Sequence, residues 1–467
     1  MLNIDDILSS QTEKDKVWQL KQKSLTIPSW SKILNDYEPT KHAIVTDKHS
    51  RKDKVRKGDG FVEKASRIHI GLEQLITRRM TEFCFAIPPK RRYKNIENNE
   101  IKNAIVNAIE SIYTTARINS LNIKRGIPYF ASCEICSVWY TVKEKNTLYG
   151  FSCDYKLKCV NYSPMDGVSL YPLFDELGDL IAMSFEYTRD VMEEEVTYFE
   201  TYTKDRHLKW ESAEGTYKVV IDEPIILGKI PCIYMYRPQP IFHGLSHIRE
   251  EIEYTLSRNS DTIAYNSAPI LKVVGNTIKG VEDKGEARRV VRVENGGDVA
   301  YVSWSQSPQA VQSHIEEMLS FFFKLAQMPD ISFEKMSALG NIGYDARKTL
   351  LTDAHLKVGD ESGNIIEFLD REFNVIKAFL KLMNPEWASI LDEISVEITL
   401  NPYVQEDETM KVQTLLTANG GKPVMSQLDS IRMAGFSNNP QATQEQINNE
   451  NAQMQNLQMA SIMNGAI

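Results

Sequence analysis

The chain has 467 residues, 42% hydrophobic and 25% charged, an ordinary composition for a folded protein of about two to four domains. Its net charge of −9, from 63 acidic and 54 basic residues, argues against a surface that grips nucleic acid throughout, because such binding depends on Lys and Arg. No apolar run approaches the ~18–20 residues that span a bilayer, and the acidic start MLNIDDILSS does not resemble a signal peptide. We therefore expect synthesis in the cytoplasm and no membrane partner.

The first distinctive stretch is a basic one, KHAIVTDKHSRKDKVRKGDG, at residues 41–60. Between Lys48 and Gly60 it holds six Lys or Arg against two Asp. Runs of like charge are usually solvated, so we interpret this stretch as a loop, with a DNA-facing patch as the alternative.

Two helices are predicted next. Apolar residues recur at helical spacing from Ile68 to Phe83, and the pattern stops before Pro88. A second helix is predicted over residues 99–126, where isoleucines lie three or four positions apart: Ile101, Ile105, Ile109 and Ile112.

From about residue 127 to 237 the pattern favours strands. Short segments rich in aromatic and β-branched residues alternate with turns, as in DLIAMSFEYTRD, EEVTYFETYTKD, RHLKWESAEGTYKVVI and KIPCIYMYRP. No strand is followed by a phosphate-binding glycine loop. We predict an antiparallel meander rather than a series of βαβ units.

Four of the six cysteines fall in this region. Cys133 and Cys136 form a CxxC, but Cys153 and Cys159 are spaced C-x5-C, which is looser than the second pair of most zinc sites. The surrounding alternation indicates hairpins, and in a strand Cys133 and Cys136 would point to opposite faces. We interpret the cysteines as reduced residues in strands and keep a zinc site as the alternative.

Two amphipathic helices flank a small module at 269–306. The first, predicted over 245–267, has an apolar stripe of Leu245, Ile248, Ile252, Leu256 and Ile263. The second, predicted over 308–328, starts at Ser307–Pro308 and has a stripe of Val311, Ile315, Met318, Phe322 and Leu325. Because a helical hairpin cannot bury such stripes alone, we expect neighbouring copies of the chain to cover them.

The opposite face of the first helix is predicted to be polar. It carries Glu250, Glu251 and Glu253, which we interpret as a solvated face rather than a catalytic pair. In the flanked module, ILKVV and RRVVRVENGGDVAYV read as strands, the latter as a hairpin turning through 295–297.

The second helix is expected to stop at Pro329 and to be followed by a glycine-marked loop. Gly340 and Gly343 would each cost about 1 kcal/mol relative to Ala inside a helix. A long helix is predicted over 345–384, which Gly359 and Gly363 could bend or split, and then a strand in DEISVEITL. The last 60 or so residues are predicted to be helical and polar, with the Asn- and Gln-rich tail partly disordered unless assembly orders it.

Catalytic motifs are missing from the sequence. NGGKPVM has Pro423 where a Walker A motif needs Ser or Thr, and HExxH, GxSxG and calcium-loop patterns are absent. We therefore expect no enzymatic activity, no cofactor and no metal.

The order of these parts resembles a tailed-bacteriophage portal protein of the type found in siphophages of Gram-positive hosts. The similarity covers about residues 40–450 and is strongest over 226–403, from GKIPCIYMYRP through helix, module, helix and NIGYDARKTLL to the long helix. Ile342 stands where such proteins often have Ser. The resemblance implies a multi-part α+β portal fold, divided as follows: N-terminal segment 1–40, wing 41–240, stem helix 241–268, small α/β clip 269–306, stem helix 307–328, tunnel loop 329–346, long wing helix and strand 347–403, and crown and polar tail 404–467.

The resemblance also assigns roles to side chains. Channel DNA would meet the tunnel loop through Ser332, Glu334, Lys335, Ser337, Asn341 and Lys348, although ordinary solvent exposure is the alternative for the two lysines. Stem packing would use Leu245, Ile248, Ile252, Val311, Ile315 and Phe322. Docking at the clip would use Lys272, Arg288, Arg289 and Arg292.

Such a protein forms a ring, typically of twelve copies, at one capsid vertex of the virion. Double-stranded DNA passes through it during packaging and ejection, and its partners are the terminase large subunit, a head-completion adaptor and the major capsid or scaffolding protein. The alternatives are another head or neck component without a DNA channel, a nuclease or terminase subunit, and a cellular scaffold with a Gln-rich tail. An enzyme of that kind would need clustered acidic metal ligands or a P-loop, and neither is found.

Overall fold

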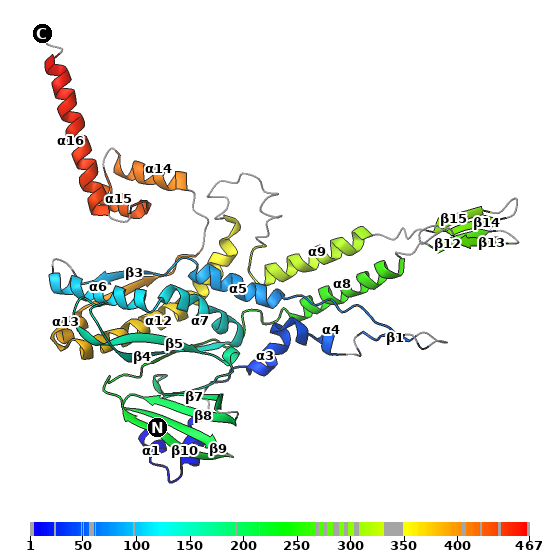
Figure 1. The fold of residues 1–467 in the computed structure, drawn as a ribbon, viewed down its shortest axis with the longest axis horizontal. Helices are drawn as coiled ribbons and strands as arrows, with labels where there is room; N and C mark the ends of the chain where they lie inside the picture. Colours follow the sequence, from blue (N-terminus) through cyan, green and yellow to red (C-terminus); the bar gives the residue numbers. More distant parts are fainter. Residues whose placement is uncertain are drawn as a thin grey trace. The chain divides into compact units, whose positions relative to one another are not determined.

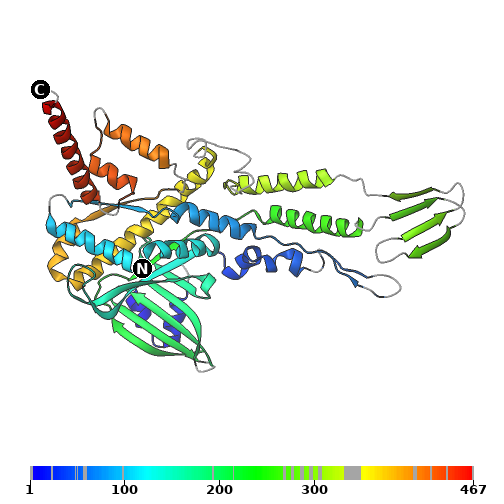
Figure 2. The same cartoon turned by 45° about the horizontal axis from the view of Figure 1, so that its top comes forward.

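The computed structural model describes residues 4–22, 25–47, 49, 51–55, 60, 62–96, 99–191, 194–213, 215–266, 270–274, 278–283, 289–293, 298–302, 308–330, 349–402, 408–420, 423–437 and 440–464. The chain forms two compact units (Figures 1 and 2). The first comprises Met1–Ser332 and Thr352–Tyr403, and the second Phe333–Leu351 and Val404–Ile467. No described helix has the length and apolarity needed to cross a bilayer.

A five-stranded antiparallel meander lies at one side of the first unit, in the order β10-β9-β8-β7-β6, as the sequence predicts. Two short N-terminal helices, α1 (Ile4–Leu8) and α2 (Glu13–Leu20), pack on it through a core that includes Phe199 and Trp210. Thr12 caps α2 by accepting a hydrogen bond from the Asp15 amide at 3.2 Å. The strands are β6 (Ser169–Phe174), β7 (Leu180–Val191), β8 (Glu194–Thr203), β9 (Arg206–Ala213) and β10 (Thr216–Pro224).

A three-stranded antiparallel sheet, in the order β11-β4-β5, packs against the meander (Figure 1). Its strands are β4 (Glu134–Asn146), β5 (Cys153–Tyr162) and β11 (Cys232–Tyr236). The core between the two sheets is apolar and includes Val138, Met183, Phe185 and Tyr234. β structure therefore starts at residue 134 rather than at about 127, because a helix continues to Ser132.

Helices cover the other side of the three-stranded sheet (Figure 1). They are α5 (Leu72–Phe85), α6 (Glu100–Thr115), α7 (Ile118–Ser132) and α12 (Thr352–Met383). The single helix predicted over 99–126 is wrong: Arg117 adopts a left-handed conformation with φ of 55°, which separates α6 from α7. Ile68 also lies outside α5, in an extended segment that precedes Gly71.

The long helix is continuous. α12 runs through Gly359 and Gly363 without a break, and a Cβ added at either glycine would meet no atom within 4 Å. A buried ion pair ties α12 to α7, since Arg125 donates to Glu372 at 3.0 Å, and Trp139 of β4 donates to the same carboxylate oxygen at 3.1 Å. Residues 345–348 of the predicted helix lie outside the described residues.

Smaller elements complete the body. The predicted strand in DEISVEITL is β16 (Ser395–Thr399), and it pairs with β3 (Lys90–Lys94), about 300 residues earlier in the chain. The basic stretch 41–60 contains α4 (Ala43–Thr46) and β1 (Lys54–Val55), which pairs with β2 (Val62–Glu63). The remaining elements here are α3 (Trp30–Tyr37), α13 (Ala388–Glu393) and the 3-10 turns η1 (Pro39–Lys41), η2 (Pro164–Asp166) and η3 (Pro385–Trp387).

The predicted helix–module–helix order is confirmed. α8 (Ser246–Asn266) and α9 (Pro308–Leu325) lie side by side in both views, and the described residues between them form strands (Figures 1 and 2). The strands are β12 (Ile270–Val274), β13 (Ile278–Asp283), β14 (Arg289–Val293) and β15 (Asp298–Val302). The predicted β14–β15 hairpin is wrong, because β12 pairs with β15 and β13 pairs with β14.

α9 ends at Leu325, four residues before Pro329. Gln327 is left-handed with φ of 55°, and the Met328 amide donates to the Phe323 carbonyl at 3.0 Å while that of Gln327 donates to Lys324 at 3.1 Å. These two bonds form a Schellman motif, which satisfies carbonyl groups at the helix end. The stop predicted at Pro329 is therefore made locally by the C-terminal cap.

The second unit contributes helices α14 (Glu408–Asn419), α15 (Gln427–Ala434) and α16 (Pro440–Asn464), in line with the predicted helical C-terminus. Ser426 caps α15 by accepting from the Asp429 amide at 3.0 Å, and Gly435, with φ of 76°, ends it. The Asn- and Gln-rich tail was predicted to be partly disordered, but its described part is the 25-residue helix α16.

All six cysteines are free thiols. Cys133 was expected in a strand, but it lies at the end of α7 with φ of 70°. Cys136 on β4 and Cys232 on β11 belong to the core between the sheets, and burial raises the pKa of the Cys232 thiol well above its usual range. Within the described residues, no three His, Cys, Asp or Glu side chains are grouped as a metal site would need.

Candidate functional site at the α8–α9 hairpin

The predicted apolar stripes of α8 and α9 are buried only in part. Leu245, Ile252 and Phe322 are 4%, 1% and 0% exposed within the single chain. The expectation that only neighbouring copies could cover these three side chains is therefore wrong. The other residues predicted to pack the hairpin are half-buried: Ile248, Val311 and Ile315.

Further along the hairpin, large apolar side chains face solvent. Tyr254 and Ile263 of α8 are 42% and 54% exposed, and Phe321 and Leu325 of α9 are 44% and 63% exposed. Burying one such side chain fully is worth about 1.5–3 kcal/mol, so this surface would be stabilised by a protein neighbour.

The polar face of α8 is held to the body by a buried group of charges, which we name the Arg249 cluster: Arg249, Glu73, Glu253, His42 and Asp36. Arg249 donates to Glu73 at 2.8 Å, to Asp36 at 2.9 Å and, more weakly, to Glu253 at 3.4 Å. The side chains of Glu73, Glu253 and His42 are all 0% exposed.

This arrangement corrects the expectation of a solvated carboxylate face on α8. Glu250 and Glu251 do remain exposed, by 43% and 54%, but Glu253 is fully buried. Glu253 accepts hydrogen bonds from His42 at 2.6 Å and from the Ile70 amide at 2.9 Å. It is a structural residue, because charged groups are buried only when paired and hydrogen-bonded.

His42 joins the cluster through both ring nitrogens. Nδ1 lies 2.6 Å from a Glu253 carboxylate oxygen and Nε2 lies 2.9 Å from the Asp36 carbonyl oxygen. Both partners are acceptors when Glu253 is ionised, so the imidazole must carry a proton on each nitrogen. The positive charges of His42 and Arg249 then lie among three carboxylates.

Burial and pairing act in opposite directions on the ionisable groups of this cluster. Burial raises the pKa of Glu73, and the nearby Arg249 only partly offsets that effect. Burial lowers the pKa of Arg249, but the attraction of Glu73 and Glu253 outweighs it and leaves the pKa above its ordinary value. Arg249 therefore stays charged, and its loss would leave buried carboxylates without a cation.

An extended segment of the body runs beside α8 and is fixed by side chains of that helix. The Ile68 amide donates to Ser257 at 2.8 Å, and the Ser66 amide donates to Asp261 at 2.9 Å. Arg51, only 8% exposed, also pairs with Asp261. The interpretation of 41–60 as a solvated loop is thus wrong for Arg51, which secures the segment to α8.

The end of α9 is tied to α12. Lys357 donates to the Ala326 carbonyl at 2.6 Å, and burial lowers the pKa of Lys357 to about 8. One turn further along α12, Glu361 pairs with Arg237 at 2.9 Å and accepts from Tyr129 at 3.0 Å. The residues on both sides of 331–348 are therefore bonded to the body.

The remaining predicted site residues are placed as follows. Lys272 lies on β12 opposite Ala300, and Arg289 and Arg292 lie on β14 opposite Asp283 and Gly280. The other predicted residues lie outside the described part of the chain: Arg288, Ser332, Glu334, Lys335, Ser337, Asn341 and Lys348.

Sequence reasoning missed the Arg249 cluster, although α8 contains a signal for it. Arg249, Glu253, Ser257 and Asp261 recur every four residues, which places them on one face of a helix. All four contact the segment before α5 or its neighbours. Their partners could not be read from the same pattern, because they lie about 170–210 residues away in sequence.

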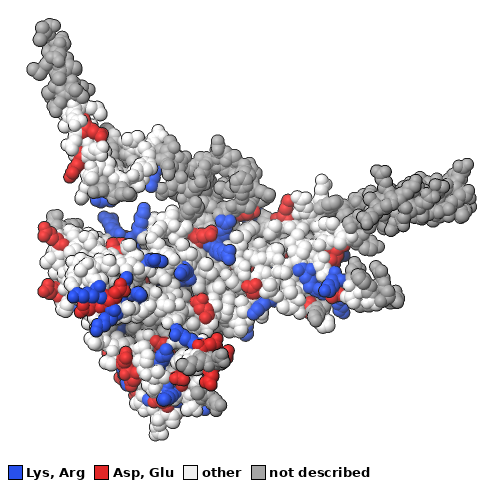
Figure 3. All heavy atoms as spheres, viewed as in Figure 1, with Lys and Arg blue, Asp and Glu red and all other residues white. Residues whose placement is uncertain are grey.

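Charges on the visible face of the body are mixed. Figure 3 shows Lys and Arg interspersed with Asp and Glu rather than forming one continuous basic surface. This agrees with a net charge of −9 and with a protein that does not grip nucleic acid over its whole surface.

A family model described as phage portal protein, SPP1 Gp6-like, matches residues 21–457. The chain belongs to this family of phage portal proteins. As a portal protein it is a structural component of the virion, forming a ring at one capsid vertex, with a channel for DNA and contacts to capsid and neck proteins.

Among solved structures, the portal protein is similar to a chain in the neck of an empty gene transfer agent particle with C6 symmetry, at 10% identity and a TM-score of 0.39. That match covers 86% of this chain and 95% of the other. A chain in the virion of the native gene transfer agent particle matches at 10% identity and a TM-score of 0.37, covering 90% and 98%. No curated protein matches the chain.

Proposed function

We propose that twelve copies of this portal protein form the ring and that its parts have the roles that the family order implies. α8 and α9 are the stem, β12–β15 are the clip, and residues 329–346 are the tunnel loop. The sheets, α5–α7, α12 and β16 form the wing, and α14–α16 form the crown.

The proposal is carried by one observation, the unequal burial of the α8–α9 hairpin. The Arg249 cluster and the buried Ile252 and Phe322 fix the hairpin to its own body, while Ile263 and Leu325 remain exposed by 54% and 63%. In a ring, the same surface of every subunit can be covered by the next subunit, and the contact closes on itself. We assign these exposed side chains to the contact between subunits.

The charge of the chain suits a conduit for DNA. If formal charges add, a ring of twelve carries about −108, twelve times the −9 of one chain, so a DNA duplex would pass without adhering. Lys335 and Lys348 of the tunnel loop would touch phosphates transiently as DNA moves.

The partners follow from the same assignment. The clip, with Lys272, Arg288, Arg289 and Arg292, docks the terminase large subunit during packaging and a head-completion adaptor afterwards. The wing and crown contact the major capsid or scaffolding protein. We also propose that the chain is made in the host cytoplasm and assembles there into the capsid vertex.

Electron microscopy of the purified chain tests the proposal. We expect rings with a central hole, and rotational averaging should give twelve subunits. A protein that stays monomeric at micromolar concentration, or that forms particles without a hole, would favour the alternative of a head or neck component that has no channel.

A further inference from the structure

The strand β11 has one edge without a partner in the described part of the chain. It pairs with β4 only, and the Trp139 amide donates to the Pro231 carbonyl while the Arg237 amide donates to the Cys133 carbonyl. In an antiparallel pair, alternate residues bond inward. The amide and carbonyl groups of the intervening residues therefore point away from the sheet: Cys232, Tyr234 and Tyr236.

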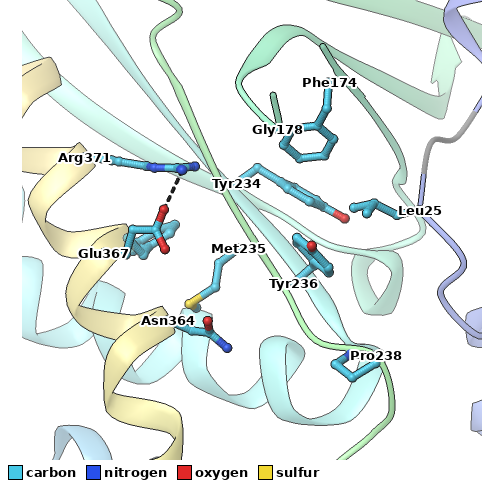
Figure 4. A pocket seen from close by; sticks show the side chains of 11 residues that line it. Leu25, Phe174, Gly178, Tyr234, Met235, Tyr236, Pro238, Asn364, Glu367 and Arg371 are labelled. Atoms are coloured by element: carbon cyan, nitrogen blue, oxygen red, sulfur yellow. Dashed lines mark hydrogen bonds and ion pairs between the residues drawn. The ribbon is translucent and has the colours of Figure 1, made fainter. Parts of the chain in front are cut away.

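Two cavities lie along this free edge. One, of about 470 Å³, is lined by Tyr234, Tyr236 and Pro238 (Figure 4). The other, of about 800 Å³, extends from Gly228 to Tyr234. Together they follow β11 from before its first residue to beyond its last, and we name this combined space the β11 groove.

The groove has a wall on each side. α12 supplies Asn364, Glu367 and Arg371 on one side, and the β6–β7 turn supplies Phe174 and Gly178 on the other (Figure 4). Glu367 and Arg371 pair with each other along the helix, so neither is a free charge at the rim.

The lining and the rim are largely apolar. The larger cavity is lined by aliphatic side chains from α1, β7, β11 and α12, among them Leu8, Ile181, Ile233 and Val375. Leu177, next to Gly178, is 91% exposed, and Ile226, two residues before Gly228, is 80% exposed. Aliphatic side chains this exposed at a groove favour an apolar occupant.

We propose that the β11 groove binds an extended segment of another virion protein, which adds to β11 as an antiparallel or parallel strand. The main chain of the segment would exchange hydrogen bonds with Cys232, Tyr234 and Tyr236, and its apolar side chains would enter the two cavities. The segment would lack proline where its amides must donate to β11. This proposal rests on the placement of the protein among capsid and neck proteins at the vertex.

A separate protein fits the groove better than a second copy of this chain. All sixteen strands in the described residues are already paired, so a second copy would bring a strand that is joined to its own sheet. The walls formed by α12 and the β6–β7 turn favour a single free strand.

Peptide binding tests the proposal. Overlapping synthetic peptides of about twelve residues, long enough for one strand, would cover the capsid, scaffolding and neck proteins encoded with this chain. We expect at least one to bind the full-length ring in a fluorescence anisotropy titration. N-methylation of every second residue should abolish binding in one phase and leave it nearly unchanged in the other, because only alternate amides face β11.

Two pairs of variants locate the site. Glu367→Trp fills the smaller cavity and should weaken binding about tenfold or more, whereas Asp360→Trp, on an exposed part of α12 outside both cavities, should not. Tyr236→Pro removes an outward amide and should weaken binding by a similar factor, whereas Tyr236→Phe keeps that amide and should retain it.

The proposal is overturned if no peptide binds, if both phases of N-methylation act alike, or if Glu367→Trp binds as the parent does. Loss of rings in Glu367→Trp, with Asp360→Trp unaffected, would identify a second copy as the occupant and also overturn it. Electron microscopy of the same samples keeps the two proposals apart, because intact rings without peptide binding contradict only strand addition.

Discussion

The guanidinium of Arg249 on α8 donates a 2.8 Å hydrogen bond to the carboxylate of Glu73 on α5, with 176 residues between them in the sequence. Both side chains are almost completely buried. This bond, with those to Glu253 and Asp36, fixes the direction in which α8 leaves the body. The position of the clip then depends on the Arg249 cluster.

Replacing Arg249 should therefore destabilise the subunit strongly. Arg249→Met keeps much of the side-chain volume but leaves Glu73 and Glu253 buried without their cation, which typically costs about 3–5 kcal/mol. Guanidinium chloride unfolding measures the change. Arg258→Met, at an exposed position of the same helix, is the control and should change stability by less than about 0.5 kcal/mol. Equal effects from the two variants would show that the cluster has no special role.

The two halves of the hairpin should respond differently to the same substitution. Ile252→Asp or Phe322→Asp introduces a carboxylate into the interior and should unfold the subunit. Ile263→Asp or Leu325→Asp changes an exposed side chain, so the subunit should stay folded but fail to form rings. Circular dichroism and electron microscopy separate these outcomes. Intact rings from the double variant Ile263→Asp/Leu325→Asp would contradict the assigned subunit contact.

Close packing of α5 against α7 depends on a glycine. A Cβ at Gly126 would lie 2.7 Å from Thr81 Cγ2 and 3.1 Å from the Phe85 ring, so Gly126→Ala should destabilise by about 1–3 kcal/mol. Gly363→Ala, within α12 and free of neighbours, is the matched control. It should stabilise the protein by about 0.5–1 kcal/mol, because Ala favours a helix over Gly. Thermal unfolding of both variants checks the opposite signs.

A buried carboxylate in the meander should make stability depend on acid pH. Burial raises the pKa of Glu200, but hydrogen bonds from His207, Tyr202 and Tyr187 outweigh it and lower the pKa to about 2. A depressed carboxyl pKa contributes stability above the unfolded value of 4.5, and the contribution fades as the pH falls from 4.5 toward 2.

Glu200→Gln should accordingly lose about 2 kcal/mol at pH 7, and the deficit should shrink below about pH 4.5. Denaturant unfolding at several pH values measures it. Glu195→Gln, at an exposed position of the same strand, serves as the control. A deficit that stays constant from pH 7 to pH 3 would show that the charge of Glu200 does not stabilise the fold.

The tunnel loop can be tested without disturbing the body. Deletion of residues 333–343 leaves the bonds of Ala326 and Lys357 in place, so rings should still form. Packaging or retention of DNA should fall, because the residues assigned to channel contact would be removed. Quantifying DNA in particles that carry the deleted chain decides the matter, and normal DNA content would refute the role of the loop.

Periodicity in the sequence was sufficient to predict several elements. The stripes of α8 and α9, the alternation in β7 to β10 and the strand β16 all appear where local patterns place them. These predictions succeed because an element's period follows from its backbone geometry. The break at Arg117 could not be predicted in this way, since neither Gly nor Pro marks it and the left-handed turn follows from how α6 and α7 pack.

The sequence by itself determined the order of the parts and, through that order, the portal family and the absence of any recognised catalytic motif. Only the tertiary structure decided which carboxylate of REEIEY is buried, which apolar residues of the hairpin the subunit covers itself, and which edge of β11 stays free. Those features depend on partners such as His42 and Glu73, far away in the sequence. Burial is a property of assembled surfaces, whereas a helical or strand period is a property of a single segment.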